Sequence, residues 1–193
     1  EKILIMRVCK KIDEYIESVE PENRVIVAFD GVAPVAKLEQ QRNRRYKSVL
    51  DRPFIEEYMD KQQVDFWDKT AITPGTNFMN KLTDSVTNYY KKHSKYNSTR
   101  ELDIIVSGTN EVGEGEHKIF DFIRKNSETH KKENTIIYGL DADLIMLCLN
   151  HLHMSRSIYL FRETPEFIKS IDSSLEPNKE YYLDIPDVVS IYY

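Results

Sequence analysis

LDIIVSGTNEVGEGEHKIF, at residues 102–120, sets a short apolar run before a glycine-rich loop that carries two glutamates. An apolar run of this length, rich in Val and Ile, predicts a buried strand. Two similar runs lie elsewhere in the chain, VIVAF at residues 25–29 and TIIYGL at residues 135–140. Each run leads into acidic side chains, so carboxylates follow three predicted strands. These acids are Asp30, Glu114, Glu116, Asp141 and Asp143.

Strand-like and helical segments alternate along the chain. This alternation predicts an α/β fold with a mainly parallel sheet and helices on both faces. The carboxyl ends of parallel strands meet at one edge, where such folds bind ligands, so the five acids are expected to gather there. The expected strands are residues 25–29, 102–106, 135–140 and 157–162, and the expected helices are residues 3–19, 35–50, 116–126 and 142–152.

Proline and polar residues mark the expected boundaries between these elements. The helix at 35–50 is expected to end before Pro53, with a second amphipathic stretch from Phe54 to about Trp67. Thr76 is expected to cap a helix with an apolar face. That face would carry Phe78, Met79, Leu82, Val86 and Tyr90. Loops are expected at residues 91–100, 126–134 and 163–182, and a helix start at residues 184–186.

The five carboxylates have two readings. A single acid at a strand end is usually a turn residue or a helix cap, and Asp143 alone fits that role. Five together would repel one another and cost stability unless cations bound there. Mg²⁺ prefers oxygen ligands, and two ions about 4 Å apart could polarise a phosphate and activate water. The pattern predicts a magnesium site, with Mn²⁺ as a substitute. His117 is not assigned as a ligand, and His151 and His153 are expected to be exposed.

A basic helix is expected just after Asp30. Lys37, Gln41 and Arg45 are spaced i, i+4, i+8, with Arg44 beside them. Such a helix is often just a solvated charged face. Here its start is expected near the acidic edge, and arginine forks match phosphate oxygens, so a pocket for a second phosphate is the competing interpretation.

The length, net charge and cysteine content of the chain limit its size class, partners and compartment. The chain has 193 residues and a net charge of −5, which suits one domain, residues 1–193, and argues against a protein that simply coats nucleic acid. Cys9 and Cys148 are expected to be free, buried thiols of a reducing compartment. No membrane association and a monomer are expected. Both ends lie inside helical or apolar patterns, so the domain is expected to be incomplete at both ends.

Four blocks, in order, resemble the XRN family of 5′→3′ exoribonucleases (Xrn and Rat1 types). They are DGVAPVAK with QQRNRR between residues 30 and 45, ITPGT at 72–76 with Phe78 and Met79, GEGEHKI at 113–119, and YGLDADLIML at 138–147. The resemblance implies a PIN/FEN-like nuclease fold and Mg²⁺-dependent removal of nucleotides from RNA that bears a 5′ monophosphate. It makes Asp30, Glu114, Glu116, Asp141 and Asp143 metal-site acids, and Lys37, Gln41, Arg44 and Arg45 the 5′-phosphate pocket.

The chain departs from the family pattern in several places. The opening block with its first-strand acid and a later Asn-Asp block are missing, and Val35 and Val112 replace a basic residue and a proline. The zinc knuckle of many nuclear members is absent, which favours the cytoplasmic type, or a viral or compact relative, over a nuclear one. Two alternatives stay open: a flap-type DNA nuclease, and an RNA 5′-end binding module without catalysis. Protein partners are not indicated.

Overall fold

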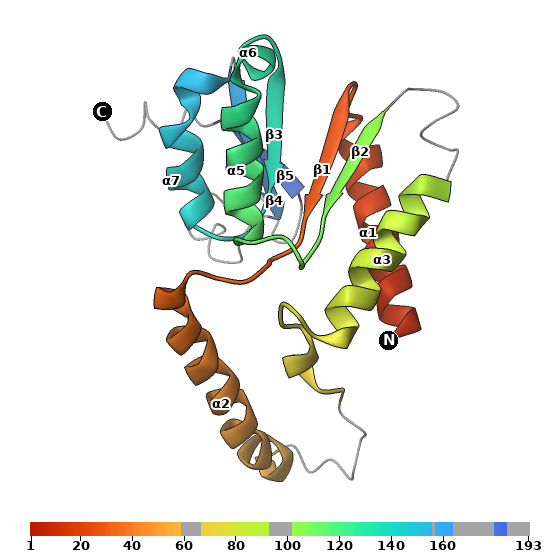
Figure 1. Ribbon diagram of the computed structural model, residues 1–193, viewed down its shortest axis with the longest axis vertical. Helices are drawn as coiled ribbons and strands as arrows, with labels where there is room; N and C mark the ends of the chain where they lie inside the picture. The colour runs from red at the N-terminus through yellow and green to blue at the C-terminus, as the bar shows by residue number, and fades with distance from the viewer. Residues whose placement is uncertain (59–66, 93–101, 156, 164–179, 185–193) are drawn as a thin grey trace, which may run out of the picture. The chain divides into compact units, whose positions relative to one another are not determined.

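A computed structural model describes residues 1–58, 67–92, 102–155, 157–163 and 180–184 (Figure 1). The chain forms two compact units, Glu1–Lys118 and Ile119–Tyr193, which we describe separately. Two of the strand pairings that the structure describes are parallel, β1 with β2 and β3 with β4. This confirms the predicted α/β class with mainly parallel strands, while the PIN/FEN-like fold and the single-domain boundaries stay predictions.

The first unit packs two helices against a parallel strand pair (Figure 1). Strands β1 and β2 pair from Arg24↔Asp103 to Ala28↔Ser107. Helices α1 and α3 contact each other, and α3 also contacts β2. The elements are α1 (Lys2–Val19), β1 (Arg24–Ala28), α2 (Val35–Tyr58), the 3₁₀ turn η1 (Lys69–Ala71), α3 (Asn77–Lys92) and β2 (Asp103–Ser107).

Helix α3 follows its sequence pattern closely. The Thr76 hydroxyl accepts a hydrogen bond from the Met79 amide at 3.3 Å, which confirms the predicted cap. All five apolar side chains predicted for its buried face are buried. Two polar contacts also join α3 to α1: the hydroxyls of Tyr89 and Tyr90 donate to Asp13 at 2.6 and 3.1 Å. The bond to Asp13 raises the pKa of Tyr89 to about 12.

The second unit places helices beside a three-stranded sheet of order β3-β4-β5, in which β5 runs antiparallel to β4. Its core joins apolar residues of α5 and α7 to β3 and β4, and Cys148, Ile158 and Leu160 are fully buried. Its elements are α5 (Gly115–Lys125, which begins in the first unit), α6 (Ser127–His130), β3 (Asn134–Tyr138), α7 (Asp143–Asn150), η2 (Leu152–Met154), β4 (Ser157–Glu163) and β5 (Glu180–Asp184).

Both cysteines are free and buried, as predicted. Burial raises the pKa of the Cys148 thiol to about 11, and burial together with nearby Asp13 raises the pKa of the Cys9 thiol. Thiols with raised pKa values hold little reactive thiolate at neutral pH. Among the described residues, no helix combines the length and the apolar character needed to cross a bilayer.

Several predicted boundaries were wrong. Helix α2 continues through Pro53 to Tyr58. A proline inside a helix withholds one backbone hydrogen bond and disfavours a continuous helix, but it does not exclude one. The expected loop at 126–134 contains α6, whose single turn is too short to show a periodicity.

The segment 163–182, expected to be mostly loop, has strand residues at both of its described ends. Glu163 belongs to β4, and residues 180–182 belong to β5. An edge strand of this kind forms through pairing with a distant partner, which local sequence does not reveal. Residues 164–179 lie outside the described residues. So do residues 59–66 of the expected stretch 54–67, residues 93–100 of the expected loop 91–100, and residues 185–186 of the expected helix start.

Truncating the central strand of the second unit should destabilise it. Leu160 is fully buried, so Leu160→Ala should lower the free energy of unfolding by about 2–5 kcal/mol through lost transfer energy and a cavity. Met146→Ala is the control, because that side chain is 60% exposed on α7 and should change stability by less than about 1 kcal/mol. Urea unfolding followed by circular dichroism measures both. Equal effects would place Leu160 outside a packed core.

Candidate metal centre

The parallel pair β1–β2 brings two segments of the first unit to one end of the sheet. Beyond the paired strands, the Phe29 amide still donates to the Ser107 carbonyl at 2.9 Å. The chain then continues as Asp30 on one side and as the loop 108–114 on the other. Parallel pairing therefore places the start of this loop beside Asp30.

The loop folds back onto the residues that follow Asp30. The Gly31 amide donates to the Gly113 carbonyl at 2.8 Å, and the Gly113 amide donates to the Val32 carbonyl at 3.1 Å. Gly113 has a φ of +104°, a conformation that residues with a Cβ rarely adopt. A Cβ on Gly31 would collide with the Glu111 carbonyl. Both glycines are required for this close approach of two backbones.

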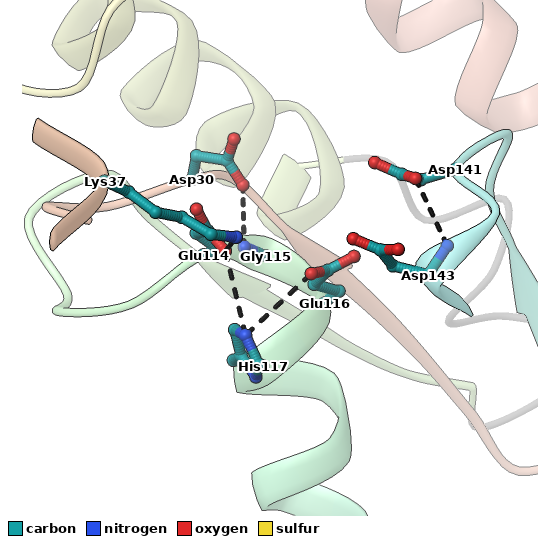
Figure 2. A network of polar contacts seen from close by, with 8 residues as sticks. All are labelled: Asp30, Lys37, Glu114, Gly115, Glu116, His117, Asp141 and Asp143. Atoms are coloured by element: carbon teal, nitrogen blue, oxygen red, sulfur yellow. Dashed lines mark hydrogen bonds and ion pairs between the residues drawn. The ribbon is translucent and has the colours of Figure 1, made fainter. Parts of the chain in front are cut away.

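Asp30 joins the end of β1 to the start of α5. Its Oδ1 atom accepts a hydrogen bond from the Gly115 amide at 2.7 Å (Figure 2). Gly115 is the first residue of α5, so the carboxylate lies at the positive end of the helix dipole. A Cβ on Gly115 would lie 2.8 Å from the Ala28 carbonyl oxygen and 3.2 Å from Asp30 Oδ1. The helix can approach β1 this closely only because this residue is glycine.

The first turn of α5 gathers the candidate ligands. Figure 2 shows Glu114, Glu116 and His117 around one point, and one ligand atom from each lies within 4.8 Å of the others. The two glutamate side chains are 13% and 19% exposed, and His117 is 51% exposed. His117 Nε2 lies 3.7 Å from Glu114 and 3.9 Å from Glu116. Two half-buried carboxylates beside an imidazole are a donor set that fits a divalent cation.

Two lysines offset this negative charge. Lys37 Nζ donates to Glu114 Oε2 at 2.7 Å. Lys118 Nζ donates to the carbonyls of Phe29 and Gly108 at 2.9 and 2.6 Å. Burial lowers the pKa of the Lys118 ammonium, although the charges of Glu111 and Asp30 oppose that shift. Sequence reasoning gave Lys118 no role. The available signal was its position three residues after Gly115, which places the two residues on the same side of α5.

Asp141 and Asp143 belong to the second unit. Asp141 Oδ1 accepts a hydrogen bond from the Asp143 amide at 3.2 Å (Figure 2). Asp143 is the first residue of α7, and both side chains are exposed. Asp141, rather than Asp143, therefore makes the local contact of a helix-capping residue. Their predicted role as metal ligands stays a prediction.

The four predicted phosphate-binding residues all lie on α2. Lys37, at its start, contacts Glu114, so this helix begins beside the carboxylates. Arg45 Nε donates to the Gln41 carbonyl at 3.3 Å, and Arg44 and Arg45 are exposed. A hollow of about 470 Å³ along α2 includes only Arg44 of the four. It is lined by Ala36, Glu39, Gln40, Asn43, Arg44 and Lys47.

The expectation for one of the two late histidines was wrong. His153 is exposed as predicted, but His151 is 7% exposed and its ring lies 4.6 Å from that of Phe120. Its Nδ1 donates to the Leu147 carbonyl at 2.7 Å, so its Nε2 accepts from the Arg124 guanidinium at 3.1 Å. These contacts satisfy both nitrogens in the second unit, which makes the burial possible.

Comparison with known proteins finds one family model and several similar proteins, all of them 5′-3′ exonucleases. The family described as XRN 5′-3′ exonuclease N-terminus matches residues 1–164. The chain is 41% identical over 159 residues to 5′-3′ exoribonuclease 1 of Saccharomyces cerevisiae, covering 78% of this chain and 10% of that protein. It is 34% identical to 5′-3′ exoribonuclease 2 of Emericella nidulans, covering 86% of this chain and 19% of that protein. It is 36% identical to 5′-3′ exoribonuclease 2 of Schizosaccharomyces pombe, covering 93% of this chain and 21% of that protein. It therefore spans between a tenth and about a fifth of these relatives.

Adding one methyl group where α5 meets β1 should disturb the candidate metal centre. Gly115→Ala brings a Cβ within 2.8 Å of the Ala28 carbonyl oxygen, so the helix must shift. We expect a loss of about 1–3 kcal/mol in unfolding free energy and weaker Mn²⁺ binding. Calorimetric titration with Mn²⁺ and thermal unfolding measure the two effects. Val112→Ala, at an 83% exposed position of the same loop, is the control. Wild-type affinity in Gly115→Ala would show that this contact does not shape the site.

Proposed function

This chain belongs to the XRN family of 5′→3′ exonucleases, and from that premise we propose that it is the nuclease part of an enzyme that hydrolyses RNA from its 5′ end. The observation that carries the proposal is the cluster of Glu114, Glu116 and His117 on the first turn of α5. Asp30 is tied to the same turn through Gly115. A metal-dependent nuclease needs carboxylates in a fixed arrangement that can hold its cations.

The cofactor that we propose is Mg²⁺, in two ions, with Mn²⁺ as a substitute. Asp30, Glu114 and Glu116 would hold it in the first unit, and the sequence pattern adds Asp141 and Asp143 as further ligands. Carboxylate oxygens suit these hard cations, whereas His117 is a poorer partner for Mg²⁺. When bound, the cations would polarise the scissile phosphate and stabilise the charge that develops on it.

The substrate end that we propose is a 5′ monophosphate. Lys37, Gln41, Arg44 and Arg45 would bind it, because arginine forks bind phosphate oxygens through paired hydrogen bonds. The contact of Lys37 with Glu114 supports this, since it puts the start of the basic helix beside the acids. A cap or a triphosphate would bring extra bulk and charge that these residues do not match.

RNA is the favoured nucleic acid because the relatives that match are named exoribonucleases. A flap-type DNA nuclease and a binding module without catalysis are the competing functions, and the substrate assay below separates them. We further propose a monomer in the cytoplasm. The chain has two cysteines, both free and buried, and so cannot build the zinc knuckle of many nuclear members.

The choice of substrate tests the proposed function directly. The natural full-length protein should degrade 5′-phosphorylated RNA in the presence of Mg²⁺ and should leave 5′-flap DNA largely intact. Glu116→Gln and Asp141→Asn should each reduce the rate about 10³-fold, which corresponds to about 4 kcal/mol of transition-state stabilisation. Release of nucleoside monophosphates over time measures both effects.

The control for this assay is Glu128→Gln, because Glu128 pairs with Lys131 on the surface of the second unit and should not affect turnover. Preferential cleavage of flap DNA would move the protein to the DNA nucleases. RNA binding without Mg²⁺-dependent hydrolysis would make it a binding module.

The preference for a 5′ phosphate should depend on the face of α2 that carries Gln41, Arg44 and Arg45. Arg45→Ala should raise KM for 5′-phosphorylated RNA and reduce the preference over 5′-hydroxyl RNA, because a paired phosphate contact is lost. Metal affinity should hardly change. The control is Arg42→Ala, which removes the same charge from the same helix at a position outside the predicted pocket. Comparing kcat/KM on both RNAs decides the matter. An unchanged preference in Arg45→Ala would return this face of α2 to a solvated basic surface.

A further inference from the structure

Lys118 occupies the point where the hydrogen-bond ladder between β1 and β2 stops. The last ladder bond joins the Phe29 amide to the Ser107 carbonyl. The next two carbonyls in line, those of Phe29 and Gly108, both accept from Lys118 Nζ, at 2.9 and 2.6 Å. One ammonium group therefore closes the end of the sheet at the place where the strands diverge.

The same residue is tied to the candidate metal ligands on both sides. Phe29 directly precedes Asp30, so the carbonyl that Lys118 holds belongs to the peptide that leads into Asp30. Lys118 itself lies on the first turn of α5, two residues after Glu116, and its amide donates to the Glu114 carbonyl at 3.1 Å. A shift of this side chain would move the backbone next to Asp30 relative to the turn that carries the two glutamates.

Other contacts already provide what the fold needs at this point. The parallel register from Arg24↔Asp103 to Ala28↔Ser107 and the packing of α3 against β2 also hold this part of the fold together. Lys118 is only partly buried, and its ammonium group is held by two backbone carbonyls rather than by an acidic side chain. These contacts suit a residue that fixes the position of the backbone next to Asp30 better than one that only stabilises the fold.

We infer that Lys118 is a positioning residue for the metal centre: by holding the carbonyls of Phe29 and Gly108, it fixes Asp30 relative to Glu114 and Glu116. The separation of the carboxylates is then set before a cation arrives, which raises affinity by removing the cost of ordering the ligands. The link to RNA hydrolysis rests on the proposed function, but the link to cation binding does not.

The test compares Lys118→Met, which keeps the length of the side chain and removes its donors, with Lys118→Arg, which keeps donors on a bulkier head. Lys125→Met is the control, because Lys125 lies on the same helix with a side chain that is 74% exposed. In the natural full-length protein, three quantities are measured: Tm in EDTA, the Mn²⁺ dissociation constant from the electron paramagnetic resonance of free Mn²⁺, and kcat and KM on 5′-phosphorylated RNA.

We expect Lys118→Met to weaken Mn²⁺ binding at least tenfold and to lower kcat at saturating Mn²⁺, with KM for RNA changed less than about twofold. Lys118→Arg should fall between Lys118→Met and the wild type, and Lys125→Met should match the wild type. A lower Tm in EDTA with unchanged Mn²⁺ affinity and kcat would overturn the inference, because that is the pattern of a structural role. If Lys118→Met does not fold, Lys118→Arg decides: several-fold weaker Mn²⁺ binding at a similar Tm supports the inference, and wild-type affinity overturns it.

The two proposals fail in different ways. A wild-type protein that does not hydrolyse RNA, but loses Mn²⁺ affinity in Lys118→Met, would contradict the proposed function and leave the positioning role intact. A wild-type protein that hydrolyses RNA, with Mn²⁺ affinity and kcat that Lys118→Met leaves unchanged, would contradict the positioning role alone.

Discussion

The hydrogen bond from the Gly115 amide to Asp30 Oδ1 is the contact on which the candidate site depends. It fixes the first residue of α5 against Asp30, which lies two residues beyond the end of β1 and 85 residues from Gly115 in the sequence. The contact is possible because Gly115 has no Cβ to collide with the Ala28 carbonyl. Once this bond forms, it fixes the position of the turn that carries Glu114, Glu116 and His117. A carboxylate at a helix N-terminus is also favourable by itself, so the contact stabilises the fold as well as the site.

Charge balance is the second constraint on this region. Two half-buried glutamates and Asp30 would repel one another, and in the structure Lys37 pairs with Glu114. A divalent cation at Glu114 would compete with Lys37 for the same oxygen atom. If Lys37 also binds the 5′ phosphate, the arrival of the cation and the availability of Lys37 become linked. The charges of α2 and those of the turn with Glu114 and Glu116 therefore influence one another within the first unit.

Much of this arrangement could be predicted because it depends on local patterns. The apolar runs that precede Asp30 and Glu114, the cap at Thr76 and the buried face of α3 all follow from short-range periodicity and helix capping. Both cysteines were correctly expected to be buried and free. Gly113 and Gly115 of the GEGE stretch serve the fold in different ways, because Gly113 adopts a positive φ and Gly115 lets α5 approach β1 closely.

The features that the sequence could not reveal depend on partners far away in the chain. The burial of His151 requires Phe120 and Arg124, which belong to another helix. Strand β5 forms through pairing with β4, and α2 continues through Pro53 although a proline disfavours a helix interior. Lys118 is the most instructive case. Its neighbours in the sequence mark it as part of an acidic turn, but its role becomes visible only when the carbonyls of Phe29 and Gly108 are both found on its ammonium group.

A cation held by Glu114 and by the first turn of α5, which is tied to Asp30, can be located directly. The most direct measurement is the anomalous scattering of Mn²⁺ in crystals of the full-length protein soaked with MnCl₂. We expect an anomalous peak within bonding distance of the carboxylate oxygens of Glu114 or Glu116, and none there in crystals soaked with EDTA. Manganese bound only at other places, with these carboxylates left on Lys37 and on backbone amides, would contradict it.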